Sequence, residues 1–249
     1  LNLELNEKSY RIDTKDSFDL SIPIADKGQI NAYYLNEARF KPFQSGSFIG
    51  EVVQGGSVNC FDVYFNPHGN GTHTESIGHI DKNRTSVNQV LNEWIFIAQV
   101  LTVKPDEKPN GDNVIGIDHL KDRIDERANA LIIRTLPNEE AKRNQQYSGT
   151  NPTFFHPDAA SYIRSQSIDH LLVDLPSLDR EEDDGKLASH REFWDFEKNA
   201  RRHATITELI FVPESVDDDI YLLNLQVAAI ELDASPSRPV IYKLYSSNE

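Results

Sequence analysis

The chain of 249 residues contains no methionine and a single cysteine, Cys60. An internal disulfide is therefore excluded, and so is a structural zinc site built from several thiolates. Cys60 lies in the strand-like run SVNCFDVYF, residues 57–65, so we expect a buried small apolar residue there and no nucleophile. Because no methionine is present, we also expect the natural N-terminus to lie outside this sequence.

Long apolar runs and a surplus of basic residues are also lacking. No stretch of about 18 apolar residues is present, and no apolar segment led by lysine opens the chain. We therefore expect neither a membrane span nor a signal peptide, and favour a cytoplasmic protein, with secretion left open by the missing start. The 25 basic residues stand against 40 acidic ones, a net charge of −15. Because nucleic acids and anionic membranes are bound by clustered Lys and Arg, neither is an expected partner.

Strand-like patterns dominate what is present. Runs rich in Ile, Val, Phe and Tyr lie at residues 18–24, 57–65, 94–103, 130–136, 170–175, 205–212, 220–232 and 239–245. Helical patterns are fewer, at residues 85–94, 156–166 and 190–203. Segments 104–113 and 178–189 read as surface loops too short to separate domains. The sequence predicts a strand-rich α/β protein with a single domain over residues 1–249.

The stretch NPHGNGTHTESIGHI, residues 66–80, gathers His68, His73, Glu75 and His79. Imidazole and carboxylate together suit Zn²⁺, Mn²⁺ or Fe²⁺. His73 and Glu75 are two residues apart, so in an extended chain both lie on one face and reach one ion. We expect the glycines at 69, 71 and 78 to let the backbone turn tightly and approach an ion or substrate. At this density a metal or catalytic site is favoured over three unrelated histidines in a polar loop.

The segment HGNGTHTESIGH resembles the signature of the metal-dependent cyclase/hydrolase family that includes bacterial kynurenine formamidase and isatin hydrolase. The usual form of that signature is His-x-Gly-Thr-His-x-Asp-x-Pro-x-His. The segments DLSIPI, ALIIRT, FFHPDAASYIRSQSIDHLLVDLPSLD, ASHREFW and ITELIFVPES resemble the family in the same order, from about residue 18 to the C-terminus. The resemblance implies a swivelling β/β/α fold that is strand-rich with few helices, and a homodimer or homotetramer.

The resemblance also implies roles for particular residues. It makes His79 the proton shuttle, and it makes Glu75 a carboxylate that can bridge two metals. The divalent ion is zinc or manganese, as one or two ions. The implied metal ligands are His68, His73, Glu75, His190 and Glu208.

Three departures from the family signature are present. Four residues instead of three separate His68 from His73, Glu75 replaces an aspartate, and Ile77 replaces a proline. The predicted function is hydrolysis of an amide, lactam or formamide bond in a small substrate, aromatic or not, by metal-activated water. Three alternatives stay open: a cyclase or dehydratase on the same scaffold, a cupin-like metalloprotein, and a non-catalytic relative that binds a metal or ligand.

The other four histidines have no companion pattern. We expect each of them to be a surface histidine or one satisfied by ordinary hydrogen bonds. They are His119, His156, His170 and His203.

Overall fold

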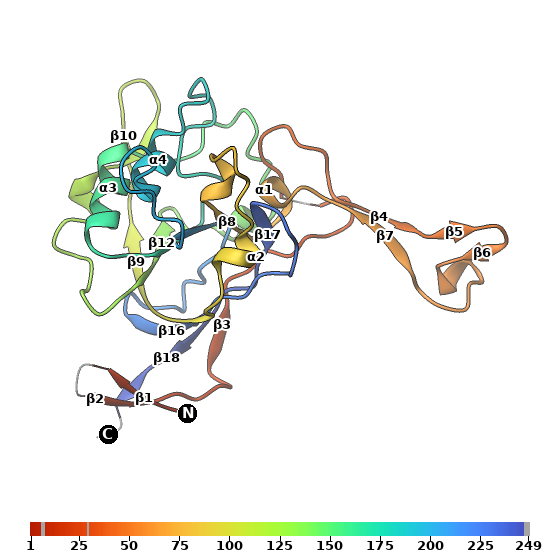
Figure 1. Ribbon diagram of the computed structural model, residues 1–249, viewed down its shortest axis with the longest axis horizontal. Helices are drawn as coiled ribbons and strands as arrows, with labels where there is room; N and C mark the ends of the chain where they lie inside the picture. Colours follow the sequence, from red (N-terminus) through yellow and green to blue (C-terminus); the bar gives the residue numbers. More distant parts are fainter. Residues whose placement is uncertain (6–7, 29, 247–249) are drawn as a thin grey trace.

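A curled sheet of nine strands forms the centre of the protein in the computed structural model, which describes residues 1–5, 8–28 and 30–246 (Figure 1). The strand order is β17-β8-β15-β14-β12-β9-β16-β18-β3. The four inner strands β9, β12, β14 and β15 run parallel, and the outer ones pair antiparallel. The strands are β3 (Ser17–Asp19), β8 (His73–Ser76), β9 (Ile95–Val103), β12 (Ala130–Thr135), β14 (His170–Val173), β15 (Thr205–Glu208), β16 (Ile220–Asn224), β17 (Ala234–Pro236) and β18 (Val240–Lys243).

The two faces of this sheet are buried under different layers. Leu131 and Ile133 of β12 face one layer, which contains the helices α3 (Pro157–Ser165) and α4 (Ala188–Trp194). Ala130 and Ile132 face the other, which is formed by loops and by side chains of β16. Strands covered on both faces read as continuous apolar runs, which is why these were visible in the sequence. The prediction of a strand-rich α/β fold with few helices is confirmed.

Several predicted elements are shorter in the structure. The run 205–212 forms a strand only to Glu208, because Leu209 has a positive φ of 55° that turns the chain. The helix predicted over 190–203 is wrong in its second half: α4 ends at Trp194, and Asp195 adopts φ 49°. The helix predicted over 85–94 is a single turn, α2 (Val87–Val90). In contrast, α3 begins as predicted, with Pro157 in its first turn and the His156 side chain accepting from Asp158 N.

A two-stranded arm projects from the body of the protein (Figure 1). It consists of β4 (Arg39–Pro42) paired with β7 (Phe61–Tyr64), followed outward by β5 (Gln44–Ser45), β6 (Phe48–Ile49) and the 3₁₀ turn η1 (Val52–Gln54). Cys60 lies here and is exposed, so its predicted burial is wrong. A lone ribbon has no second layer of structure to cover its faces, whatever the apolar content of its sequence.

The remaining elements are short. Two small sheets flank the body, one of them joining the N- and C-terminal strands (Figure 1). Among the described residues, no helix is both long and apolar enough to cross a membrane. These elements are β1 (Asn2–Leu5), β2 (Lys8–Arg11) and β19 (Tyr245–Ser246); β10 (Asp106–Glu107), β11 (Asn113–Ile115) and β13 (Phe154–Phe155); α1 (Pro67–Asn70); and the 3₁₀ turns η2 (Ile77–His79), η3 (Ile117–His119) and η4 (Glu140–Asn144).

Candidate metal centre

Two neighbouring strands supply three of the predicted site residues. His73 and Glu75 lie two apart on β8, fully buried, and Glu208 lies on β15 directly opposite His73. Residues opposite one another in an antiparallel pair point to the same face. His73 Nε2 is accordingly 3.4 Å from Glu208 Oε2. The other oxygen of Glu208 accepts a hydrogen bond from Leu178 N at 3.1 Å, which fixes the carboxylate.

The short helical turns on either side of β8 supply two more. His68 lies on α1, where the Asn66 side chain caps the turn by accepting from His68 N. His79 ends η2, which the Ser76 side chain caps by accepting from Gly78 N. Glu75 Oε2 is 3.3 Å from His68 Nδ1 and 3.7 Å from His79 Nδ1. The extra residue between His68 and His73 therefore does not keep His68 away from Glu75.

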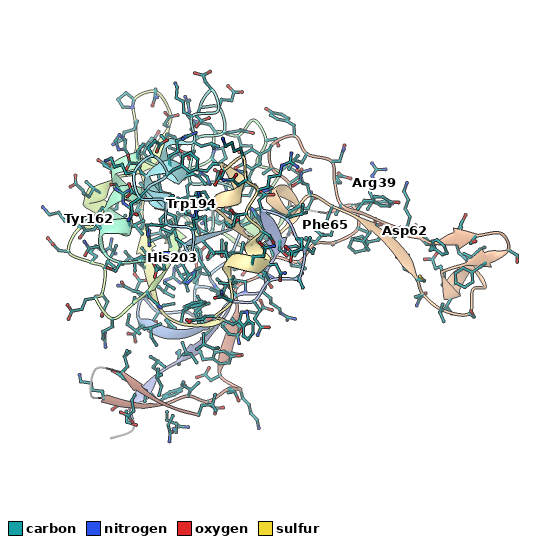
Figure 2. The ribbon with its side chains drawn as sticks, in the orientation of Figure 1. Arg39, Asp62, Phe65, Tyr162, Trp194 and His203 are labelled. Atoms are coloured by element: carbon teal, nitrogen blue, oxygen red, sulfur yellow. The ribbon has the colours of Figure 1, made fainter. Side chains whose placement is uncertain are left out.

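The sixth residue, His190, lies on α4. Its Nε2 is 3.1 Å from Glu75 Oε1 and 3.6 Å from Glu208 Oε1. Trp194, which is labelled in Figure 2, lies one turn later on α4. Its ring lies against that of His190, with centroids 5.6 Å apart. The structure thus brings all six predicted residues together around Glu75.

Three of the imidazoles place one ring nitrogen within hydrogen-bond distance of an acceptor oxygen that does not belong to the six predicted residues. Carbonyl and carboxylate oxygens only accept, so the ring nitrogen facing them carries the proton. The other nitrogen of each ring faces a carboxylate oxygen of the group, and it would offer its lone pair when a metal is bound. The outer pairs are His73 Nδ1 with Gly71 O at 3.1 Å, His190 Nδ1 with Asp179 Oδ2 at 2.6 Å, and His68 Nε2 with Asp233 Oδ2 at 3.0 Å.

The inward-facing atoms match what a cation needs. His73 Nε2, His190 Nε2 and both oxygens of Glu75 are buried with no hydrogen-bond partner. Buried polar atoms are nearly always paired, so this set calls for an explanation. Lone pairs and carboxylate oxygens within 4.8 Å of one another, with a second acceptor behind each ring, form the usual surroundings of a bound divalent metal. The residues present therefore fit such an ion.

The pKa shifts show that the imidazoles and carboxylates of the centre stabilise one another's charges. Burial alone would raise the pKa of Glu75, but His79 and His190 outweigh it and hold the pKa well below the ordinary value. Burial would lower the pKa of His68, yet hydrogen bonds to Asp233 and Glu75 raise it to about 10. The Glu75 carboxylate is thus stabilised by the positive charge of neighbouring imidazoles, and the charged form of His68 is stabilised by neighbouring carboxylates.

Two carboxylates at the site had no role in the sequence prediction. Asp179 is the second residue of the segment 178–189, which was predicted to be a solvated loop; for this residue the prediction is wrong, because its carboxylate is buried against Ser189 N and His190 N. Asp233 lies 154 residues after His79, and no local pattern marks it.

The remaining histidines are satisfied elsewhere, as predicted. His170 is buried with its Nδ1 2.9 Å from Thr205 Oγ1. His156 contacts Asp158, and His203 contacts Asp169 at 3.0 Å (Figure 2). His119 pairs with the backbone of Gly116. None of them belongs to the groups of possible metal ligands among the described residues.

The fold and the site define a strand-rich α/β protein with a buried centre of imidazoles and carboxylates. The family model described as "Putative cyclase" matches residues 18–180. The chain belongs to this putative cyclase family, which confirms the resemblance seen in the sequence.

Proteins similar to the chain are named kynurenine formamidase, metal-dependent hydrolase or isatin hydrolase. The kynurenine formamidase of Bacillus cytotoxicus is 27% identical over 192 residues, covering 77% of this chain and 83% of the relative. That of Bacillus mycoides is 27% identical over 187 residues, covering 75% and 81%. A predicted metal-dependent hydrolase from Bacillus stearothermophilus has a TM-score of 0.63 at 15% identity, covering 91% and 97%. An isatin hydrolase bound to thioisatinate has a TM-score of 0.64 at 14% identity, covering 91% and 92%. At these identities the structural likeness establishes the fold.

Proposed function

We propose that the chain is a hydrolase that cleaves an amide, lactam or formamide bond of a small aromatic substrate with metal-activated water. The observation that carries this proposal is the set of inward-facing, unpaired atoms around Glu75. The similarity to proteins named kynurenine formamidase, together with the fold shared with an isatin hydrolase, supports the choice of reaction.

The metal would be held by nitrogen and oxygen atoms that suit zinc or manganese. Glu75 directs Oε2 towards His68 and Oε1 towards His190, so its two oxygens would be available to one ion or to two. When bound, the metal would lower the pKa of its water towards about 7 and would stabilise negative charge on the carbonyl oxygen. The proposed ligands are His68, His73, Glu75, His190 and Glu208.

His79 is proposed to carry the proton. Its side chain is 28% exposed, so it lies at the solvent-facing edge of the centre, the side that we propose for substrate entry. An imidazole accepts and releases a proton near neutral pH. In the proposed reaction, water oxygen bonds to the carbonyl carbon, the C–N bond breaks, and His79 passes the proton taken from water to the leaving nitrogen. The products are a carboxylate and an amine.

The test compares hydrolysis of a panel of aryl formamides and lactams in ¹⁸O-labelled water. We expect one ¹⁸O atom in the carboxylate product, with His79→Gln lowering kcat roughly 10²- to 10⁴-fold while metal content is retained. His203→Gln, far from the site, is the matched control. Unchanged turnover by His79→Gln would overturn the role of His79. Turnover without ¹⁸O would indicate a cyclase or dehydratase, and metal binding without any turnover would indicate a non-catalytic relative.

We also propose that two copies of the chain associate through the arm, as a homodimer or as the half of a homotetramer. Residues 39–65 contain two basic and two acidic side chains and are neutral, whereas the chain as a whole carries −15. Two such acidic chains meet with least repulsion where the net charge is zero. Val53 is 88% exposed, and large apolar side chains are exposed along the arm at Phe43, Phe48, Val52, Val53, Val58, Phe61, Val63 and Tyr64.

An arm-shortened variant tests this association. Replacing residues 43–60 by an Asn-Gly turn joins Pro42 to Phe61, which face one another in the β4–β7 pair. Sedimentation is expected to show an oligomer for the full chain and a monomer for the variant. An unchanged oligomer in the variant, or a monomeric full chain, would contradict the proposal.

A further inference from the structure

Asp233 is fixed beside the site by its backbone. It immediately precedes β17, the strand that borders β8, and its carbonyl accepts a hydrogen bond from Ser76 N at 2.9 Å. The next residue, Ala234, pairs with Glu75 across the two strands. The side chain therefore starts from a position defined by the sheet.

One oxygen of the Asp233 side chain contacts two imidazoles. Asp233 Oδ2 lies 3.0 Å from His68 Nε2 and 3.4 Å from His79 Nδ1. These two rings also lie next to one another, with centroids 4.4 Å apart. The carboxylate thus connects the first proposed ligand to the proposed proton carrier without contacting the inner carboxylates.

His68 needs such a contact more than the other proposed ligands do. It lies on a helical turn of four residues, separated from β8 by one residue more than the family signature has. Its side chain is 20% exposed, whereas those of His73 and His190 are buried, so water competes for its nitrogens. His190 offers the comparison within the same molecule, because Asp179 holds its outer nitrogen at 2.6 Å.

We propose that Asp233 is a positioning residue that fixes the tautomers of both His68 and His79. This inference rests on the proposed function, since the roles of both histidines come from it. Accepting from His68 Nε2–H directs the lone pair of Nδ1 towards Glu75 and the metal. Accepting from His79 Nδ1–H leaves the lone pair on Nε2, which is then the nitrogen that takes the proton from water.

The first measurement is metal affinity, by calorimetric titration of metal-stripped protein with Mn²⁺. Asp233→Ala is expected to bind roughly 10- to 100-fold more weakly, as for other carboxylates behind a ligand histidine. Asp233→Asn retains an acceptor oxygen and is expected to recover part of the loss. Glu231→Gln is the matched control, because Glu231 lies on the same segment and contacts Asn88 and Gln89 instead of the site. Every variant retains the carbonyl that pairs with Ser76, so the strand stays in place.

The second measurement separates positioning from a general structural role. Two-bond ¹H–¹⁵N imidazole spectra of wild type and Asp233→Ala, recorded with Zn²⁺ bound and again without metal, report which nitrogens carry protons. In the Zn²⁺-bound wild type we expect Nε2–H on His68 and Nδ1–H on His79, and loss of both assignments in Asp233→Ala with an unchanged unfolding midpoint. Equal affinity and equal tautomers in the variant would overturn the inference. If wild type binds no Mn²⁺, the proposed function fails, while these spectra still decide whether Asp233 orients the two rings.

Discussion

Around the candidate metal centre, single residues are needed for packing as well as for chemistry. An added Cβ at Gly71 would lie 2.9 Å from Ile22 O, and one at Gly78 would lie 2.1 Å from Thr85 O. The glycines between the histidines are thus needed because neighbouring stretches of the chain pass very close, a reason the sequence prediction did not contain. The close approach holds η2, and with it His79, against the segment before α2.

The substitution Gly78→Ala is expected to lower the free energy of unfolding by about 1–3 kcal/mol or more, because the atoms it meets are backbone and cannot rotate away. Urea denaturation measures the change. Gly116→Ala is the control, since its nearest atom, His119 Nδ1, is 4.0 Å from the added Cβ. Equal losses in both variants would contradict the steric explanation.

His170 gives a pH dependence away from the candidate metal centre. Burial lowers its pKa from 6.5 to about 4, so the unfolded chain binds this proton more readily than the folded one. The neutral ring therefore stabilises the fold fully above about pH 6.5, and this contribution is lost as pH falls towards 4. By pH 5 the loss is about 2 kcal/mol. Denaturation at pH 7.5 and 5.0 should show a smaller drop for His170→Gln than for wild type; equal drops would contradict the assignment.

At the scale of elements, α4 depends on a residue outside itself. The helix follows Leu187, which has φ 48° and provides no side-chain cap. Asp179 instead accepts from Ser189 N at 2.7 Å and His190 N at 3.1 Å, and its Oδ2 also holds the His190 ring. One carboxylate thus caps the helix and directs its histidine towards Glu75.

Asp179→Ala should therefore have two effects in one variant. Losing the cap is expected to lower the free energy of unfolding by about 1–2 kcal/mol. Losing the acceptor behind His190 should weaken Mn²⁺ binding roughly 10- to 100-fold, measured by titration. The exposed Glu182, three residues later, provides the control variant Glu182→Ala. Weaker folding with unchanged metal affinity would remove Asp179 from the metal site.

The elements also show what the sequence alone could and could not predict. The inner strands were visible because both faces are buried, and α3 because Pro157 and Asp158 mark its start. The end of α4 was not, because Phe196 packs against the core from a turn as well as it would from a helix. Apolar spacing does not distinguish these two cases.

The site residues also differ in whether the sequence alone could predict them. His73 and Glu75 follow from strand spacing, a local property of β8. His190 and Glu208 were assigned only by family resemblance, because their approach to Glu75 depends on how distant elements pack. Asp233 was missed, since a single aspartate beside a strand far along the chain has no local signature.

At the scale of the whole molecule, several carboxylates of this acidic chain lie together at the candidate metal centre. Among the described residues, four carboxylates lie on its histidines: Glu75, Asp179, Glu208 and Asp233. Bringing like charges together in a chain of net −15 opposes folding. A divalent cation that binds only the folded state offsets this cost.

Thermal stability should consequently follow metal content. Adding Mn²⁺ or Zn²⁺ to stripped protein at about 100 times Kd is expected to stabilise the fold by about 2.7 kcal/mol, seen as a higher Tm. Glu75→Gln should show little of this gain, because the shared carboxylate is lost. A Tm that is independent of metal in wild type would contradict binding at the centre.

The most direct test of metal-assisted amide hydrolysis is the turnover of an aryl formamide by native, metal-stripped and reloaded protein. We expect stripping to abolish turnover, and returning Zn²⁺ or Mn²⁺ to restore it in wild type but not in Glu75→Gln. Full turnover by the stripped protein, with its metal content verified by elemental analysis, would contradict metal-assisted hydrolysis at this centre.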